Sequence, residues 1–298
     1  MSDIKICFNT NERWLRQTQR ALYDIVIRKN PDTNITFYII FDTIDASSEF
    51  EAFKSIPNIT IITDTINASE AFDNKLQPYS NKWLGAFKHI KFLLPELEIL
   101  KSVDKLLYLD VDVLARKDLT ELYNLDLEDK AIGAVKDYAH LRMLNYSVLF
   151  ELETKIDPGI LVLSLDKLRE VDFVNKCKKE APRFAGDIDL IKCVGTPYNK
   201  YIAPKYQIPY HFICTEPAFR EIDKWNDYYG TNYNNINDLI ADSFLWHYCG
   251  DKDMFYSDIP SVKASFDLSS QRLNTFLSTR EVMEWKPEDD ATLYVNFN

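Results

Sequence analysis

Residues 105–115 read Lys-Leu-Leu-Tyr-Leu-Asp-Val-Asp-Val-Leu-Ala, and this stretch decides the fold class. The apolar run at 106–109 has the length and composition of a strand that is buried on both faces. Asp110 and Asp112 follow it, and residues two apart on extended backbone point to the same side. Two carboxylates at the end of a buried strand are costly to desolvate unless something compensates them. We therefore predict a divalent cation site in the crevice beyond this strand, where α/β sheets bind ligands.

Alternating strands and helices surround this central strand. The chain before it reads strand, helix, strand, short helix, strand, which predicts a parallel sheet with right-handed crossovers. The predicted fold class is therefore α/β, with a mixed, mostly parallel central sheet flanked by helices. We expect strands at 4–8, 35–41, 59–62, 106–109, 131–135 and 160–165, and helices that begin near residues 11, 47, 81, 166 and 186.

The composition bounds the class of protein. The chain has 298 residues, of which 46% are hydrophobic, and its net charge of −11 does not favour a nucleic-acid partner. Its 7 glycines form neither Gly-x-Gly-x-x-Gly nor a Walker-type loop. We find no signal-peptide pattern and no apolar run of about 18 residues, so we expect no transmembrane segment and leave peripheral membrane contact open. The 5 scattered cysteines predict reduced thiols and a cytoplasmic protein.

His247 is the best candidate for a third ligand, although it lies far from the central strand in the sequence. It begins a small turn, His-Tyr-Cys-Gly. A lone histidine is more often structural than functional. Two carboxylates and one imidazole nevertheless suit Mn²⁺, with Mg²⁺ as the alternative, and leave coordination positions open for a diphosphate.

Three further segments carry weaker signals. Lys88, His89 and Lys91 lie among apolar neighbours in an expected helix over 81–94, and a solvated helix face is the ordinary interpretation. The stretch 198–233 is rich in Tyr, Pro and Asn, which predicts an ordered loop region that lines an acceptor site. We assign no role to the polar, acidic end of the chain. We therefore predict one domain over 1–255 and a carboxyl-terminal extension over 256–298.

Eight short motifs of the chain occur in a characteristic order. They are a first strand that leads into a turn at 8–11, Asn-Pro-Asp-Thr at 30–33, Lys-Phe-Leu-Leu-Pro-Glu-Leu at 91–97, Leu-Tyr-Leu-Asp-Val-Asp at 107–112, Gly-Ala-Val-Lys-Asp at 133–137, Asp-Pro-Gly-Ile-Leu-Val-Leu-Ser-Leu at 157–165, Gly-Asp-Ile-Asp at 186–189 and His-Tyr-Cys-Gly at 247–250. Each motif is weak alone, but together they are specific. Over about 4–255 the chain resembles glycosyltransferase family 8, which includes bacterial lipopolysaccharide galactosyl- and glucosyltransferases and glycogenin.

The resemblance implies a GT-A fold with a Rossmann-like nucleotide-binding half. It also implies a UDP-sugar donor, a Mn²⁺ ion, a glycan or other hydroxyl acceptor, and transfer of a hexose with retention of anomeric configuration. In the implied site, Asp110, Asp112 and His247 hold the metal, and Asp110 also approaches the donor ribose.

The resemblance also implies contacts with the donor sugar and the nucleotide. Asp137 and Asp187 would hydrogen-bond the sugar hydroxyls, and Asp157 is placed with them as a catalytic residue. The implied nucleotide contacts are Phe8, Asn9, Thr10 and Asn11 at uracil and ribose, Lys91 and Val111 beside the metal motif, and Gly250 and Lys252 at the diphosphate.

The chain departs from the family pattern around the donor sugar. The family has Gln, which faces the anomeric centre, where this chain has Ile188, and it has Asn where this chain has Asp157. An Arg of the family is replaced by Lys91, Lys252 lies one place early, and the turn at 8–11 lacks the family's Asp. We therefore expect a preserved metal site and an unusual donor or acceptor preference.

Two other functions are compatible with parts of the sequence. Phosphohydrolases of the haloacid dehalogenase type also place Asp-x-Asp after an apolar strand, and would use Asp110 as nucleophile with Mg²⁺. In that group the motif ends the first strand, whereas three expected strands precede it here, and His247 would have no role. The other alternative is a weakly active or inactive relative that binds a nucleotide sugar or carbohydrate, which the departures at Asp157 and Ile188 favour.

Overall fold

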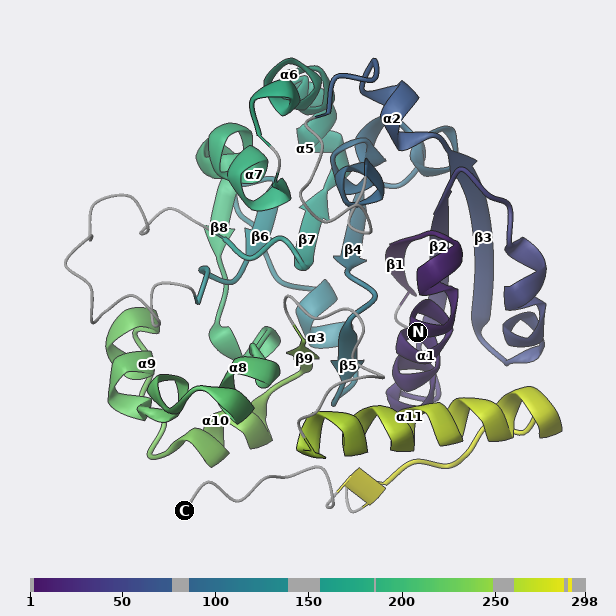
Figure 1. The fold of residues 1–298 in the computed structure, drawn as a ribbon, viewed down its shortest axis with the longest axis vertical. Helices are drawn as coiled ribbons and strands as arrows, with labels where there is room; N and C mark the ends of the chain where they lie inside the picture. The colour runs from purple at the N-terminus through teal and green to yellow at the C-terminus, as the bar shows by residue number, and fades with distance from the viewer. Residues whose placement is uncertain are drawn as a thin grey trace.

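A twisted sheet with helices on both faces forms the centre of the molecule (Figure 1). The computed structural model describes residues 3–76, 86–138, 156–184, 186–248, 260–286 and 289–290. Within these ranges a seven-stranded sheet has the order β3-β2-β1-β4-β7-β6-β8. Its strands are β1 (Asp3–Thr10), β2 (Asn34–Asp42), β3 (Ile59–Ile66), β4 (Lys105–Leu109), β6 (Ile132–Ala134), β7 (Ile160–Ser164) and β8 (Asn199–Tyr201).

The strand directions match the predicted mixed, mostly parallel sheet. β1 pairs in parallel with β2 and β4, β2 pairs in parallel with β3, and β6 pairs in parallel with β8. β7 runs antiparallel to both of its neighbours, β4 and β6. Leu106, Leu107 and Leu109 of β4 are fully buried, as expected for a central strand covered on both faces. The prediction of an α/β sheet built around 106–109 is therefore confirmed.

Most of the helices are short, and many are single 3₁₀ turns. The longer ones are α1 (Leu15–Arg28) and α11 (Pro260–Thr279), which pack against each other. The other helical segments are η1 (Glu12–Trp14), η2 (Ser47–Ser55), α2 (Ala68–Ala71), η4 (Ala86–Phe92), η5 (Leu94–Glu96), η6 (Glu98–Leu100), α3 (Thr120–Tyr123), α5 (Leu165–Glu170), α6 (Phe173–Glu180), η7 (Ala181–Arg183), α7 (Asp187–Gly195), η8 (Thr196–Tyr198), η9 (Pro204–Tyr206), α8 (Tyr210–Thr215), η10 (Pro217–Arg220), α9 (Ile222–Tyr229) and α10 (Ile236–Asp242).

The stretch 198–233 is helical for much of its length, so the prediction of a loop region was wrong. It contains η9, α8, η10 and α9, and Pro204 and Pro217 each stand at the first helical position. Tyr210, Phe219 and Trp225 are fully buried in a second apolar cluster. Each of these helices is too short for a repeating apolar pattern, and tertiary packing of its aromatic side chains stabilises it instead.

The cationic group at 88–91 is buried, so the interpretation as a solvated helix face was also wrong. Lys88, His89 and Lys91 are at most 7% exposed in η4. Residues 81–85 of the expected helix lie outside the described ranges. Burial of a lysine requires nearby negative charge, and acidic residues of the site provide it for Lys91.

The carboxyl-terminal part of the chain contains a long helix that we did not predict from the sequence. α11 buries Val262, Phe266, Leu273 and Phe276, and the ring of Phe276 stacks on Tyr23 of α1 at a centroid distance of 4.9 Å. Figure 1 shows α11, drawn in yellow, crossing beside α1 at one end of the sheet. Among the helices of the described ranges, none has the length and apolarity needed to cross a membrane.

Candidate metal and donor site

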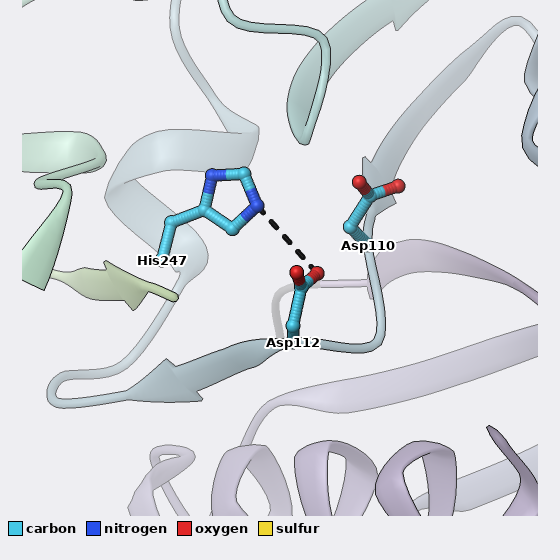
Figure 2. Close-up of side chains that lie close together, drawn as sticks. All are labelled: Asp110, Asp112 and His247. Atoms are coloured by element: carbon cyan, nitrogen blue, oxygen red, sulfur yellow. Dashed lines mark ion pairs between the residues drawn. The ribbon is translucent and has the colours of Figure 1, made fainter. Parts of the chain in front are cut away.

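The three predicted metal ligands meet at the carboxyl end of β4. Asp110 follows β4, and Asp112 immediately precedes β5 (Val113–Ala115). His247 is the last residue of β9 (Leu245–His247), which pairs antiparallel with β5 so that Val113 faces His247. The backbone N–H of Tyr248 donates to the Asp112 carbonyl at 3.0 Å, which continues the pairing past the two strands. Figure 2 shows the three side chains pointing toward one common space.

The donor atoms of this group fit a divalent cation. One ligand atom from each of Asp110, Asp112 and His247 lies within 4.8 Å of the others. His247 Nε2 is 3.5 Å from Asp112 Oδ1, and both residues are at most 4% exposed, whereas Asp110 is half-buried (Figure 2). Two carboxylates and one imidazole are a suitable ligand set for Mn²⁺, and the more open Asp110 leaves the group accessible to a ligand.

A second layer of residues orients the His247 ring. Its Nδ1 is 3.2 Å from Asp157 Oδ2 and 2.8 Å from the side-chain amide group of Gln207. Burial would raise the pKa of Asp157, but its interactions with His247 and the backbone N–H of Gly159 outweigh burial and lower that pKa. Donation from Nδ1–H to an ionised carboxylate leaves the Nε2 lone pair for a metal, as in many metal–histidine sites. Asp157, predicted as a catalytic residue, thus contacts the imidazole directly, and the sequence contained no signal for Gln207.

Lys91 connects the metal motif with the start of α7. Its Nζ donates to Asp110 Oδ1 at 3.2 Å, to Asp187 Oδ2 at 2.9 Å and to the Pro158 carbonyl at 3.0 Å. Nζ also lies 4.9 Å from the centroid of the Tyr108 ring. Burial would raise the pKa of Asp187, but Lys91 and other charges lower it below its usual value. Asp187 is therefore held as a carboxylate beside Asp110.

The predicted nucleotide turn lies at the end of β1, next to β4 in the sheet. Phe8 is fully buried and packs against Phe37, so its side chain belongs to the core. Asn9 is 1% exposed, and among the described residues its amide nitrogen and oxygen have no hydrogen-bond partner. Thr10 accepts a hydrogen bond from Thr18 at 2.9 Å. The amide of Asn9 thus remains available to a ligand at this edge.

The remaining predicted site residues lie in other parts of the chain, and two of them are outside the described ranges. Asp137 is buried just after β6, beyond the bridge that pairs Lys136 with Ile156. Asn11 is half-buried, and Val111 is buried within the Asp-x-Asp turn. Ile188, in the place of the family's Gln, is 37% exposed. Gly250 and Lys252 lie outside the described residues.

Solved structures of glycosyltransferases share the fold. The galactosyltransferase LgtC in complex with donor and acceptor sugar analogs is 20% identical, with a TM-score of 0.66 over 98% of this chain and 100% of that chain. The glycosyltransferase GlyE of Streptococcus pneumoniae TIGR4 is 16% identical, with a TM-score of 0.62 over 94% of this chain and 64% of that one. The similarity to these structures confirms the predicted GT-A fold.

Sequence relatives lead to the same family. Probable galacturonosyltransferase 13 of Arabidopsis thaliana is 40% identical over 65 residues, which are 22% of this chain and 12% of that protein. Probable galacturonosyltransferase-like 10 of the same plant is 24% identical over 201 residues, which cover 59% of this chain and 52% of that protein. The chain therefore spans only 12% and 52% of the lengths of these two relatives. Residues 5–252 match the sequence model described as Glycosyl transferase family 8. The chain belongs to glycosyl transferase family 8.

Proposed function

We propose that the protein transfers a hexose from a UDP-sugar to a hydroxyl group of a glycan acceptor, with Mn²⁺ bound by Asp110, Asp112 and His247. The observation that carries this proposal is that these three ligands converge beside the turn at residues 8–11, where we predict nucleotide contacts. The family match and the fold support glycosyl transfer as the reaction class. We also propose that the protein acts in the cytoplasm, which the unbridged thiols of Cys7, Cys177 and Cys193 support.

The leaving group of this reaction is a diphosphate, and its negative charge must be neutralised. A bound divalent cation supplies a Lewis acid and a template for the diphosphate oxygens. Asp157 holds the His247 ring so that Nε2 faces the ligand group. The ionised Asp187 can accept hydrogen bonds from donor sugar hydroxyls, and Lys91 keeps it in place. The buried Asn9 amide can pair with polar atoms of the nucleoside.

We propose retention by attack of the acceptor on the same face that the diphosphate leaves. A covalent route would require a carboxylate nucleophile at the anomeric carbon. Asp187 already forms an ion pair with Lys91, and the neighbouring Ile188 has no polar group. Same-face attack on an oxocarbenium-like ion pair requires mainly positioning from the protein, which this arrangement provides.

The test is a calorimetric titration of UDP with Mn²⁺ and again with a chelator. We expect binding only with Mn²⁺, and its loss in Asp112→Asn and His247→Ala with the fold intact. Asp129→Asn is the matched control, because Asp129 is 78% exposed and lies outside the site. UDP binding that is unchanged in both site variants would exclude this metal site. Phosphatase activity with Mg²⁺ that depends on Asp110 would instead support the phosphohydrolase alternative.

The donor screen follows from the relatives. UDP-galactose is included because LgtC is a galactosyltransferase, and UDP-galacturonate because the plant relatives are galacturonosyltransferases by name. Transfer is measured to a panel of glycan acceptors, and hydrolysis of the donor is measured in parallel. Tight UDP binding with neither transfer nor hydrolysis for any donor would favour the alternative of an inactive binding relative.

A further inference from the structure

Two of the three ligands are carried by a very small piece of sheet. β5 and β9 contribute only three residues each, and Asp112 and His247 stand at the same end of this two-stranded ribbon. A ribbon of this size is not stable alone. Its geometry, and with it the separation of Asp112 from His247, must therefore come from the residues packed around it.

Arg116 closes the other end of the ribbon. Its backbone N–H donates to the Phe244 carbonyl at 2.8 Å, next to the last ribbon pair. Its guanidinium lies 4.3 Å from the ring centroid of Trp246, the residue before His247. The Trp246 ring in turn stacks on Tyr210 at 3.8 Å. Arg116 thus contacts the chain on both sides of the ribbon, and its guanidinium packs on the Trp246 ring.

A carboxylate from the end of the chain holds Arg116. Asp290 is fully buried and forms an ion pair of 2.8 Å with Arg116 Nη1. It also accepts hydrogen bonds of 2.8 Å from Arg28 and from Arg272, and one of 3.1 Å from the Trp285 indole. Burial would raise the pKa of Asp290, but Arg28 and Arg116 outweigh it and lower that pKa, so the carboxylate is ionised. Removal of such a buried charge leaves its cationic partners uncompensated.

The same ion-pair network reaches the metal motif from the other side. Arg28 pairs with Asp24 at 3.1 Å, and Asp24 pairs with Arg20 at 3.4 Å along α1. The Arg20 guanidinium donates to the carbonyl of Val113 at 3.0 Å and to that of Val111 at 3.4 Å. These two carbonyls flank Asp112 at the start of β5, and Arg116 directly follows the end of β5. The network therefore contacts β5 at both ends.

We propose that Asp290 is a positioning residue for the metal site, acting through Arg116 on the β5–β9 ribbon. The carboxyl-terminal segment, which lies outside the family match at 5–252, thereby determines the geometry of Asp112 and His247. The inference rests on the proposed function only for the identity of the bound ion. The ribbon and its contacts do not depend on that function, so their rigidity can be tested without metal.

The test compares Arg116→Met with Arg272→Met in the full chain. Both variants remove one cation from Asp290, but Arg272 lies on α11 and pairs with Asp289 and Asp290 rather than with the ribbon. Hydrogen exchange is followed without metal at the amides of Arg116 and Tyr248, which bond Phe244 and Asp112 across the ribbon. Mn²⁺ affinity is measured by electron paramagnetic resonance, and stability by thermal unfolding.

We expect both variants to lower the midpoint of thermal unfolding. Only Arg116→Met should speed exchange in the ribbon, about tenfold, and weaken Mn²⁺ binding about tenfold, as for other residues that orient metal ligands. Arg116→Lys keeps the charge beside Asp290 and should restore much of the slow ribbon exchange and of the Mn²⁺ affinity. Asp290→Asn should behave like Arg116→Met.

Equal effects of Arg116→Met and Arg272→Met on ribbon exchange would overturn the proposal, because Asp290 would then be a general structural anchor. Unchanged exchange in Arg116→Met would overturn it as well. If the wild-type protein binds no Mn²⁺, the proposed function fails, while the exchange comparison still decides the positioning role. If Arg116→Met does not fold, Asp290→Asn is compared with Arg272→Met in the same way and judged by the same criteria.

Discussion

Gly159 leaves the space that the His247 imidazole occupies. A Cβ atom on Gly159 would lie 2.2 Å from His247 Cε1 and 2.7 Å from Nε2, which is far inside contact distance. The Gly159 carbonyl also accepts the backbone N–H of Asp110 at 2.7 Å. One residue, immediately before β7, thus adjoins two of the three proposed ligands, and its lack of a side chain is required there.

Gly159→Ala should therefore displace the imidazole and weaken Mn²⁺ binding by about tenfold or more. Isothermal calorimetry with Mn²⁺ in the absence of nucleotide measures this. Gly186→Ala is the matched control, because a Cβ at Gly186 meets its nearest neighbour, Asp189, at 3.7 Å. Equal Mn²⁺ affinity in Gly159→Ala and the wild type would contradict a role for His247 as ligand.

Lys91→Met should shift the acidic limb of the pH–rate profile to higher pH. Lys91 opposes the effect of burial and lowers the pKa of Asp187, so its loss raises that pKa and protonates the carboxylate at a less acidic pH. The profile of kcat/KM against pH for donor turnover measures the shift. Lys91→Arg, which keeps the charge, should retain the wild-type limb. An acidic limb at the same pH in the wild type, Lys91→Met and Lys91→Arg would show that Asp187 is not needed as a carboxylate.

Ile188→Gln should change donor turnover with little effect on stability. Ile188 is 37% exposed beside Asp187, and the methylene groups of glutamine can cover much of the same surface, so the replacement should cost about 1 kcal/mol or less. Rates for a panel of UDP-sugars and the thermal unfolding midpoint are measured together. Val282→Gln is the control, since Val282 is similarly exposed at 39%. If Ile188→Gln turns over every donor at the wild-type rate, Ile188 is an ordinary surface residue.

His89 should make the protein less stable as the pH falls from about 6.5 to about 4. Burial lowers the pKa of His89 from 6.5 to about 4, so in this range the unfolded chain binds a proton that the folded chain does not. By linkage the free energy of unfolding decreases as the pH falls, by about 3 kcal/mol at most. Denaturant unfolding between pH 7 and 4 measures the slope, and His89→Phe should make it shallower. Identical slopes would mean that His89 takes up its proton in the folded state as well.

Much of the fold was predictable from local patterns. The apolar run at 106–109 predicted a central strand, and β4 is that strand. The two aspartates after it, together with His247, form the close group that their residue types predicted. The helices in 198–233 were not predictable, because each has one or two turns and becomes stable only when Tyr210 and Trp225 pack together with the rest of the second apolar cluster.

The sequence by itself determined the central strand and the placement of two carboxylates at its end, because burial patterns and the spacing of residues on a strand are local properties. Only the tertiary structure decided the charge partners. Lys91 pairs with Asp187 across 96 positions, and Arg28 pairs with Asp290 across 262. A buried charge is stabilised by whichever opposite charge the fold brings to it, and no local pattern in the chain encodes that partner.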